Sequence, residues 1–296
     1  MPFRRYAQVD VFADRPGAGN PLAVVLDAED LDDTQMQAIA RWTRLPETTF
    51  VFPPVDDDAS YRIRIFSPRR EVPFAGHPSV GTAHAVLEAG LAVPRDGLLV
   101  QDGIAGKLPL RVNGEGRSRT IAVRTPRASV REVASADDPR LREALKDLRL
   151  GVLPPVLMDG GRRWWLAEIA DEALLRAATP PWAAIGALAQ STDSMGLCVF
   201  ARSDDPVYYL AVRAWVGATG QFEDAASGAA NATLAAWLAS RNALPGDGGF
   251  YRISQGREVG HDAIIELTVD NAGDVWSGGR ICTVVRGTLD WTGARA

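Results

Sequence analysis

The sequence predicts an α+β fold built from two similar lobes. Strands outnumber helices and do not alternate regularly with them, which argues against a doubly wound parallel sheet. The glycine-rich patterns GxGxxG and GxxxxGK[ST], typical of nucleotide-binding folds, do not occur in the sequence. A unit of strand, polar loop and small-residue helix occurs once in each half, and this internal similarity favours a duplicated fold.

The composition is that of a soluble globular protein. The sequence is 46% hydrophobic and 23% charged. A chain of 296 residues is long enough to bury a sizeable core. A formal charge of −5 argues against a nucleic-acid partner. The absence of a signal-peptide pattern and of a long apolar run predicts a cytoplasmic protein without a membrane partner. Two cysteines and three scattered histidines form no recognisable disulfide framework or metal site.

The first half predicts strands around two helices. Alternating apolar residues predict half-buried strands, and continuous apolar or β-branched runs predict more buried ones. Asp32 or Asp33 is a candidate N-cap for a helix that ends before Pro46. Asn113-Gly114 is a signal for a hairpin turn between two of these strands. The predicted strands are 6–12, 22–26, 48–52, 61–66, 107–112 and 119–124, and the second helix is 79–89, ended by Gly90.

The second half repeats this style after a polar segment. Residues 126–138 are polar and charged and predict a linker. A helix over 138–148 and two short helices over 171–178 and 182–190 are expected. The predicted strands are 152–157, 164–169, 197–201, 207–215, 251–255, 264–269 and 281–285.

The repeated unit has the same order of features in both halves. Arg64 lies on a strand that precedes the loop FAGHPS beginning at Phe74, and Arg213 lies on a strand that precedes the loop FEDAASG beginning at Phe222. A helix of small residues follows each loop. Coincidence is the alternative, because strand–loop–helix units are common. We favour duplication, which predicts two facing helix N-termini.

Each loop leads into a helix N-terminus through a glycine, Gly76 or Gly228. The first turn of a helix offers unpaired N–H groups and a partial positive charge, and both suit a carboxylate or phosphate. Small residues let a ligand approach the backbone. The alternative is that the glycines only permit tight helix packing, and the residues alone leave both interpretations open.

Three polar residues are candidates for acid–base chemistry. His77 is predicted to be neutral, because the positive end of a helix disfavours imidazolium, and a turn-capping role is its alternative. Asp224 is either an N-cap or a catalytic carboxylate. Glu47 is either a general base or, as most isolated glutamates are, a solvated surface residue. Cys198 and Cys282 lie in apolar strands and are predicted to be buried core residues.

The segments VDVFADRPGAGNPLAVVLD, LPETTF, FAGHPSVGTAHA and FEDAASGAAN strongly resemble the PhzF-like proteins of phenazine biosynthesis. The resemblance is dense over residues 7–90 and recurs to about residue 288. It implies a diaminopimelate epimerase-like fold, in which each lobe wraps a barrel-like sheet around a central helix and the site lies in the cleft between the lobes. The expected lobes are 1–125 and 126–296, with the last strand able to return to the first lobe.

The same resemblance implies roles for individual residues. Glu47 falls on the catalytic glutamate that moves a proton, His77 on the histidine of the AGHP loop, and Asp224 on the aspartate of the second loop. The chemistry is a cofactor-independent isomerisation of a small carboxylate, as in trans-2,3-dihydro-3-hydroxyanthranilate isomerase, and it needs no metal. A homodimer is also implied. The residues expected to bind the substrate are Gly76, Ser79, Ser227, Gly228 and Ala229.

The sequence departs from the family pattern at the second loop. The usual Thr-Gly-Ser is Ser227-Gly228-Ala229, so a hydroxyl expected to hold the substrate carboxylate is missing. The leading hypothesis is therefore an isomerase with an altered binding wall. The alternatives are an isomerase of a pyrroline-type amino acid in an antibiotic pathway and a catalytically silent binding homologue.

Overall fold

The computed structural model describes residues 3–135, 137–246 and 248–291, and these residues form two compact units. Unit 1 comprises Met1–Arg124 and Gly278–Ala296, and unit 2 comprises Thr125–Ser277. The structure thus divides the chain at Arg124, and the final segment lies with unit 1. No helix of the described residues is long and apolar enough to cross a membrane.

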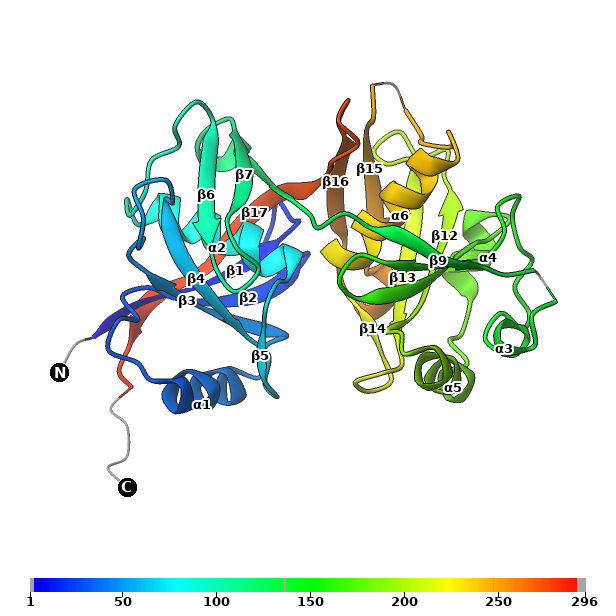
Figure 1. The fold of residues 1–296 in the computed structure, drawn as a ribbon, viewed down its shortest axis with the longest axis horizontal. Helices are drawn as coiled ribbons and strands as arrows, with labels where there is room; N and C mark the ends of the chain where they lie inside the picture. Colours follow the sequence, from blue (N-terminus) through cyan, green and yellow to red (C-terminus); the bar gives the residue numbers. More distant parts are fainter. Residues whose placement is uncertain (1–2, 136, 247, 292–296) are drawn as a thin grey trace. The chain divides into compact units, whose positions relative to one another are not determined.

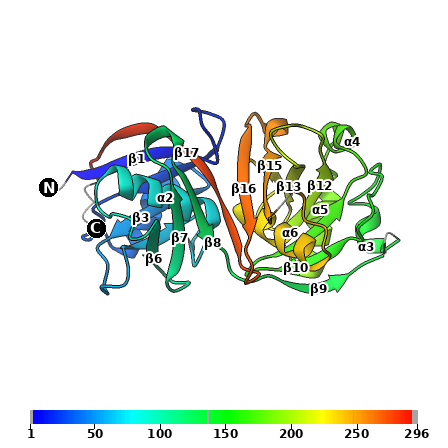
Figure 2. The ribbon, with the colours of Figure 1, turned by 90° about the horizontal axis from the view of Figure 1, so that it is seen from above.

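Unit 1 is a ring of strands around one helix (Figures 1 and 2). The ring runs β1–β2–β3–β4–β6–β7–β8–β17 and closes on β1. The β2–β3 and β4–β6 pairs are parallel. The elements are β1 (Arg4–Val11), β2 (Asn20–Val25), α1 (Asp33–Thr43), β3 (Glu47–Phe52), β4 (Tyr61–Phe66), β5 (Glu71–Val72), α2 (Gly76–Glu88), β6 (Leu98–Asp102), β7 (Leu108–Asn113), η1 (Gly116–Ser118), β8 (Thr120–Arg124) and β17 (Val275–Leu289).

Unit 2 repeats the pairing pattern of unit 1. Its strands pair in the order β9–β10–β11–β12–β13–β15–β16, with β11–β12 and β13–β15 parallel, as at the corresponding places in unit 1. The duplicated fold is therefore confirmed. The elements are β9 (Ser129–Val133), α3 (Pro139–Arg142), β10 (Val156–Asp159), β11 (Arg163–Glu168), α4 (Glu172–Ala177), α5 (Trp182–Thr192), β12 (Gly196–Arg202), β13 (Leu210–Val216), β14 (Phe222–Asp224), α6 (Gly228–Ser240), β15 (Phe250–Gln255), η2 (Arg257–Val259) and β16 (Ala263–Val269).

The central helices are buried nearly all round. In α2 every residue from Gly76 to Val86 is buried, and the helix packs against β1, β2, β3, β6 and β8. In α6 the buried residues extend from Gly228 to Leu238, and the helix packs against β9, β10, β11 and β16. A helix without a solvent face needs small or apolar residues on every side, which explains the runs of Gly, Ala, Ser and Thr.

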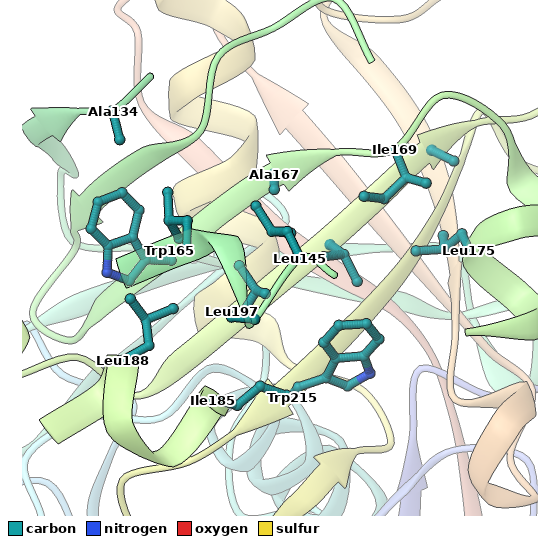
Figure 3. Close-up of a cluster of buried hydrophobic side chains, with 14 of the residues drawn as sticks. Ala134, Leu145, Trp165, Ala167, Ile169, Leu175, Ile185, Leu188, Leu197 and Trp215 are labelled. Carbon is teal, nitrogen blue, oxygen red and sulfur yellow. The ribbon is translucent and has the colours of Figure 1, made fainter. Parts of the chain in front are cut away.

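Outer helices cover the other face of several strands, which is why those strands are continuously apolar. In unit 1 the helix α1 places Met36 and Ile39 against Phe50 and Phe66. The side chain of Asp32 caps this helix, and the Gln35 side chain completes a capping box. In unit 2 a larger cluster lies under α4 and α5 and includes Trp165, Leu188 and Trp215 (Figure 3).

An Arg–Glu ion pair precedes each central helix; the pair in unit 2 is buried, and the pair in unit 1 is about a quarter exposed. In unit 2 the guanidinium of Arg213 on β13 donates to both carboxylate oxygens of Glu223 on β14, at 3.0 and 2.7 Å. In unit 1 Arg64 on β4 donates to both oxygens of Glu71 on β5, at 2.7 Å each. Each guanidinium also lies 5.2 Å from the ring centroid of the aromatic residue two positions later. The repeated arginine of the sequence thus anchors the short hairpin that leads into each helix.

The structure differs from some of the local predictions. Residues 126–138 are not a linker, because Ser129–Val133 forms β9 and pairs with β10; its charged, exposed side chains give it the composition of a loop. The helix expected over 138–148 is only Pro139–Arg142. The hairpin predicted at Asn113-Gly114 is confirmed, since β7 and β8 pair antiparallel with Asn113 opposite Thr120, and η1 lies in the loop between them. The strand β6 was not predicted.

We expect Gly81→Ala to destabilise the protein by about 1–3 kcal/mol, because a well-packed interior tolerates added volume poorly. A Cβ atom at Gly81 in α2 would lie 2.6 Å from Leu22 Cδ2 and 2.7 Å from Val11 Cγ2. Gly287→Ala is the control, since nothing lies within 4 Å of its added Cβ. Urea denaturation measures both free energies of unfolding. Equal values would contradict the tight enclosure of α2.

Replacing the glutamate of each ion pair by glutamine should lower the free energy of unfolding by different amounts in the two units. Glu223→Gln should cost about 3 kcal/mol, because both partners are buried, with side-chain exposures of 4% and 2%. Glu71→Gln should cost about 1 kcal/mol or less, because that pair is about a quarter exposed and Asp33 still contacts Arg64 at 2.6 Å. Thermal and urea unfolding of both variants give the comparison. A larger loss for Glu71→Gln would overturn this ranking.

Candidate functional site

The structure brings Glu47 and His77 together in unit 1. Glu47 is the first residue of β3, and His77 is the second residue of α2. The Oε2 atom of Glu47 lies 3.4 Å from Nε2 of His77, and the two side chains are 14% and 9% exposed. Glu47 is therefore mostly buried, which removes the interpretation as an ordinary solvated residue.

Burial keeps His77 uncharged. Its pKa falls from the ordinary 6.5 to about 3, because burial disfavours the imidazolium form. Neutrality was predicted from the helix end, but the cause in the structure is desolvation. Within the described residues, Nε2 of His77 makes no hydrogen bond. A buried polar atom without a partner is costly and is typical of sites that bind a ligand. A neutral His77 can donate a hydrogen bond through one ring nitrogen and accept one through the other.

The remaining residues predicted in unit 1 are Gly76 and Ser79. Gly76 begins α2, where the first-turn amides have no carbonyl within the helix. Ser79 is fully buried, and its hydroxyl donates to the Ala75 carbonyl at 3.0 Å. The same hydroxyl accepts from Nε2 of Gln101 at 3.0 Å. Ser79 thus has a structural role in fixing the first turn, and contact with a substrate stays a prediction.

The residues predicted in unit 2 cluster at the start of α6. Asp224 ends β14 and is partly buried, and its Oδ1 accepts from the Ala226 amide at 3.2 Å. Ser227 is the N-cap of α6, and its hydroxyl accepts from the Ala230 amide at 3.4 Å. The helix then begins with Gly228 and Ala229, whose first-turn amides have no carbonyl partner within the helix. Among the described residues, the start of α6 therefore has the Asp224 carboxylate near the backbone amides of Gly228 and Ala229, which have no partner within the helix.

Sequence reasoning assigned no role at this loop to Gln255, which holds it. Gln255 ends β15 and is fully buried. Its Nε2 donates to the Asp224 carbonyl at 2.8 Å, and its Oε1 accepts from the Ser227 amide at 3.2 Å and from Nδ2 of Asn231 at 2.7 Å. The only signal in the sequence was the Gln255-Gly256 dipeptide, whose partners are distant along the chain.

Both cysteines have thiols whose pKa is raised above the ordinary value. Cys198 is fully buried in β12, and burial together with the charge of Asp224 raises the pKa of its thiol. Cys282 in β17 is partly exposed, so the prediction of a buried core residue was wrong for it. The pKa of its thiol is also raised, mainly by desolvation. His84 is buried in α2 and contacts Thr283 Oγ1 at 2.9 Å, in line with a packing role.

The described residues offer no ready metal centre. Among them, no group of three or more His, Cys, Asp or Glu side chains is arranged to hold a metal ion. The polar atoms at the candidate positions are instead a carboxylate and imidazole pair in unit 1 and a carboxylate beside helix amides in unit 2.

The lowered pKa of His77 predicts acid sensitivity. The unfolded chain binds a proton near pH 6.5 and the folded chain only near pH 3, so stability falls as the pH drops below 6.5. Protonation of His77 in the unfolded chain should by itself lower the free energy of unfolding by about 2 kcal/mol between pH 7.5 and pH 5. Urea denaturation at both pH values should show a smaller loss for His77→Gln than for the wild type. Equal losses would mean that His77 keeps an ordinary pKa. His84 also has a pKa lowered by burial, but it is present in both proteins and cancels.

Known proteins resemble this chain along most of its length. The family model described as phenazine biosynthesis-like protein (PhzC-PhzF) matches residues 9–285. The trans-2,3-dihydro-3-hydroxyanthranilate isomerase of Pseudomonas aeruginosa is 32% identical over 91% of this chain and 92% of its own. A Schizosaccharomyces pombe protein named antisense-enhancing sequence 1 is 31% identical over 97% and 99%.

The fold has close counterparts among solved structures. A Bacillus anthracis phenazine biosynthesis protein of the PhzF family superposes with a TM-score of 0.83 over 98% of this chain and all of its own, at 23% identity, which speaks for the fold alone. The predicted two-lobed epimerase-like fold is thereby confirmed. With a family model over nearly its whole length and relatives named as isomerases, this chain belongs to the phenazine biosynthesis-like (PhzC-PhzF) family and is an isomerase.

Proposed function

We propose that the protein moves a double bond by proton transfer in a small unsaturated carboxylic or amino acid. The observation that carries the proposal is the Glu47–His77 pair at 3.4 Å, with His77 buried, neutral and without a hydrogen bond on Nε2. The relative that isomerises trans-2,3-dihydro-3-hydroxyanthranilate supports this class of substrate.

In the proposed reaction Glu47 both removes and returns a proton. The Glu47 carboxylate takes a proton from one carbon of the substrate, and the electron pair of that C–H bond shifts the double bond along the molecule. Protonated Glu47 then delivers a proton to the carbon at the other end of the shifted system. The substrate gains and loses one proton, so no oxidant, reductant or cofactor is consumed.

The other candidates have supporting roles in this proposal. Neutral His77 donates to a polar group of the substrate or steadies the negative charge that develops during proton transfer. Asp224 holds a second polar group. The first-turn amides at Gly76, Gly228 and Ala229 offer donors for a carboxylate. Because Ala229 lacks a hydroxyl, the carboxylate would depend more on these backbone donors. A cleft with Gly76 facing Gly228, a homodimer and a role in phenazine or antibiotic biosynthesis stay predictions.

Glu47→Gln is expected to bind substrate nearly as well as the wild type while turnover falls by at least about 100-fold, because the amide cannot accept the proton. Glu47→Asp should also be impaired, since its shorter side chain moves the carboxylate by about 1 Å. Turnover is measured as solvent deuterium entering a panel of unsaturated amino acids in deuterated water. The panel includes dihydrohydroxyanthranilate and pyrroline-type acids.

Glu115→Gln is the matched control, because Glu115 is an exposed glutamate of the same unit. It should turn over substrate like the wild type. Wild-type turnover by Glu47→Gln would contradict the proton shuttle. If no member of the panel took up deuterium with the wild-type protein, a substrate outside this class or a silent homologue would be favoured.

A further inference from the structure

Gln255 lies where a single side chain can fix both Asp224 and the start of α6. It ends β15, which runs parallel to β13, and its register partner is Val212. From there its carboxamide reaches the Asp224 carbonyl, the Ser227 amide and the Asn231 side chain, all within 3.2 Å. The contacts span both ends of the loop that carries the candidate residues of unit 2.

Only a carboxamide satisfies these contacts. The Asp224 carbonyl needs a donor, whereas the Ser227 amide and Nδ2 of Asn231 need an acceptor. A carboxylate would accept from both donors but would face the Asp224 carbonyl with a second acceptor. An apolar side chain would leave all three groups unpaired in the interior. The neighbouring Gly256 has a φ of 94°. A Cβ atom there would lie 2.4 Å from the Ala225 carbonyl oxygen, so the end of β15 packs directly against the same loop.

Unit 1 also has a buried glutamine, Gln101, on the corresponding strand, two register positions away from the place of Gln255. Gln101 pairs with Tyr61, three residues before Arg64. Gln255 pairs with Val212, one residue before Arg213.

Gln101 lies on β6, which runs parallel to β4 as β15 does to β13. Its Nε2 donates to the Ser79 hydroxyl, which in turn donates to the Ala75 carbonyl. Gln101 thus fixes the first turn of α2, which carries His77, through one intervening serine. Both glutamines are buried, at 3% and 0% exposure.

We propose that Gln255 and Gln101 are paired positioning residues, each of which holds the loop and first helical turn that present the acid–base side chains of its unit. Gln255 sets the backbone at Asp224, and Gln101 sets the turn at His77. The expected effect on turnover rests on the proposed function, whereas the effect on the loops does not.

The experiment compares Gln255→Met, Gln101→Met and wild type in the full chain by amide hydrogen exchange. The Ser227 amide donates to Gln255, so Gln255→Met should speed exchange in the peptide around residues 224–231 by at least about tenfold. The peptide around residues 75–84 should keep its wild-type rate. Gln101→Met should give the reverse pattern. Each variant thereby serves as the control for the other.

Gln255→Glu tests the hydrogen bond that Gln255 donates separately from the two that it accepts. Glutamate still accepts from Ser227 and Asn231 but cannot donate to the Asp224 carbonyl when ionised. The Ser227 amide should therefore stay protected, while kcat for a turned-over substrate falls at least about tenfold with KM within about threefold, because Asp224 is displaced.

Three outcomes would overturn the proposal. Unchanged exchange around residue 227 in Gln255→Met would show that Gln255 does not hold the loop. Faster exchange throughout unit 2 with a lower Tm would show a general structural role. Wild-type kcat in Gln255→Glu at high pH, where the introduced carboxyl group is ionised, would show that the Asp224 contact is irrelevant. If the wild type turns over no substrate, the proposed function fails, and the exchange patterns still decide the positioning claim.

Discussion

Enclosing a helix within a ring of strands is the constraint on which this structure depends. A helix such as α2 has no face left for water, so its side chains must be small, apolar or hydrogen-bonded. Gly81 shows the steric side of the constraint, because neighbouring side chains occupy the space of its missing Cβ. Ser79 and Asn231 show the polar side, since each is buried and bonded to the glutamine of its unit. The candidate acid–base residues of the two loops lie at the N-terminal ends of the enclosed helices.

The approach to each central helix is fixed by charge. Burying an arginine is costly unless a carboxylate and further acceptors satisfy it, and Arg213 meets that need with Glu223 and the carbonyl of Leu175. Such a pair adds little net stability compared with apolar residues, but its bidentate geometry sets the direction in which β14 leaves β13. Asp224 follows Glu223 directly, so the ion pair also determines where that candidate carboxylate lies.

Local sequence patterns predicted the parts of the fold that depend on local order. The Arg64 and Arg213 strands, the small-residue helices and the cap at Asp32 were visible in this way. The strand β9 was not, because charged residues such as Arg131 and Glu132 give it the composition of a loop, although it pairs with β10. The proximity of Glu47 to His77 came from family resemblance, since no spacing rule joins β3 to α2. The role of Gln255 at its loop was missed because its partners are set by tertiary structure.

The path of β17 has a consequence for how the chain is made. Residues Val275–Ser277 lie with unit 2, and the strand continues from Gly278 into unit 1, where it pairs with β1 and β8. During synthesis, unit 2 is a continuous stretch that emerges whole, whereas the ring of unit 1 lacks its closing strand until residues near Leu289 leave the ribosome. The edges of β1 and β8 stay open for that interval, and exposed edges invite pairing with other chains. Unit 1 is thus synthesised first but completed last, and a nascent chain that stalls before β17 keeps the edges of both β1 and β8 unpaired with it.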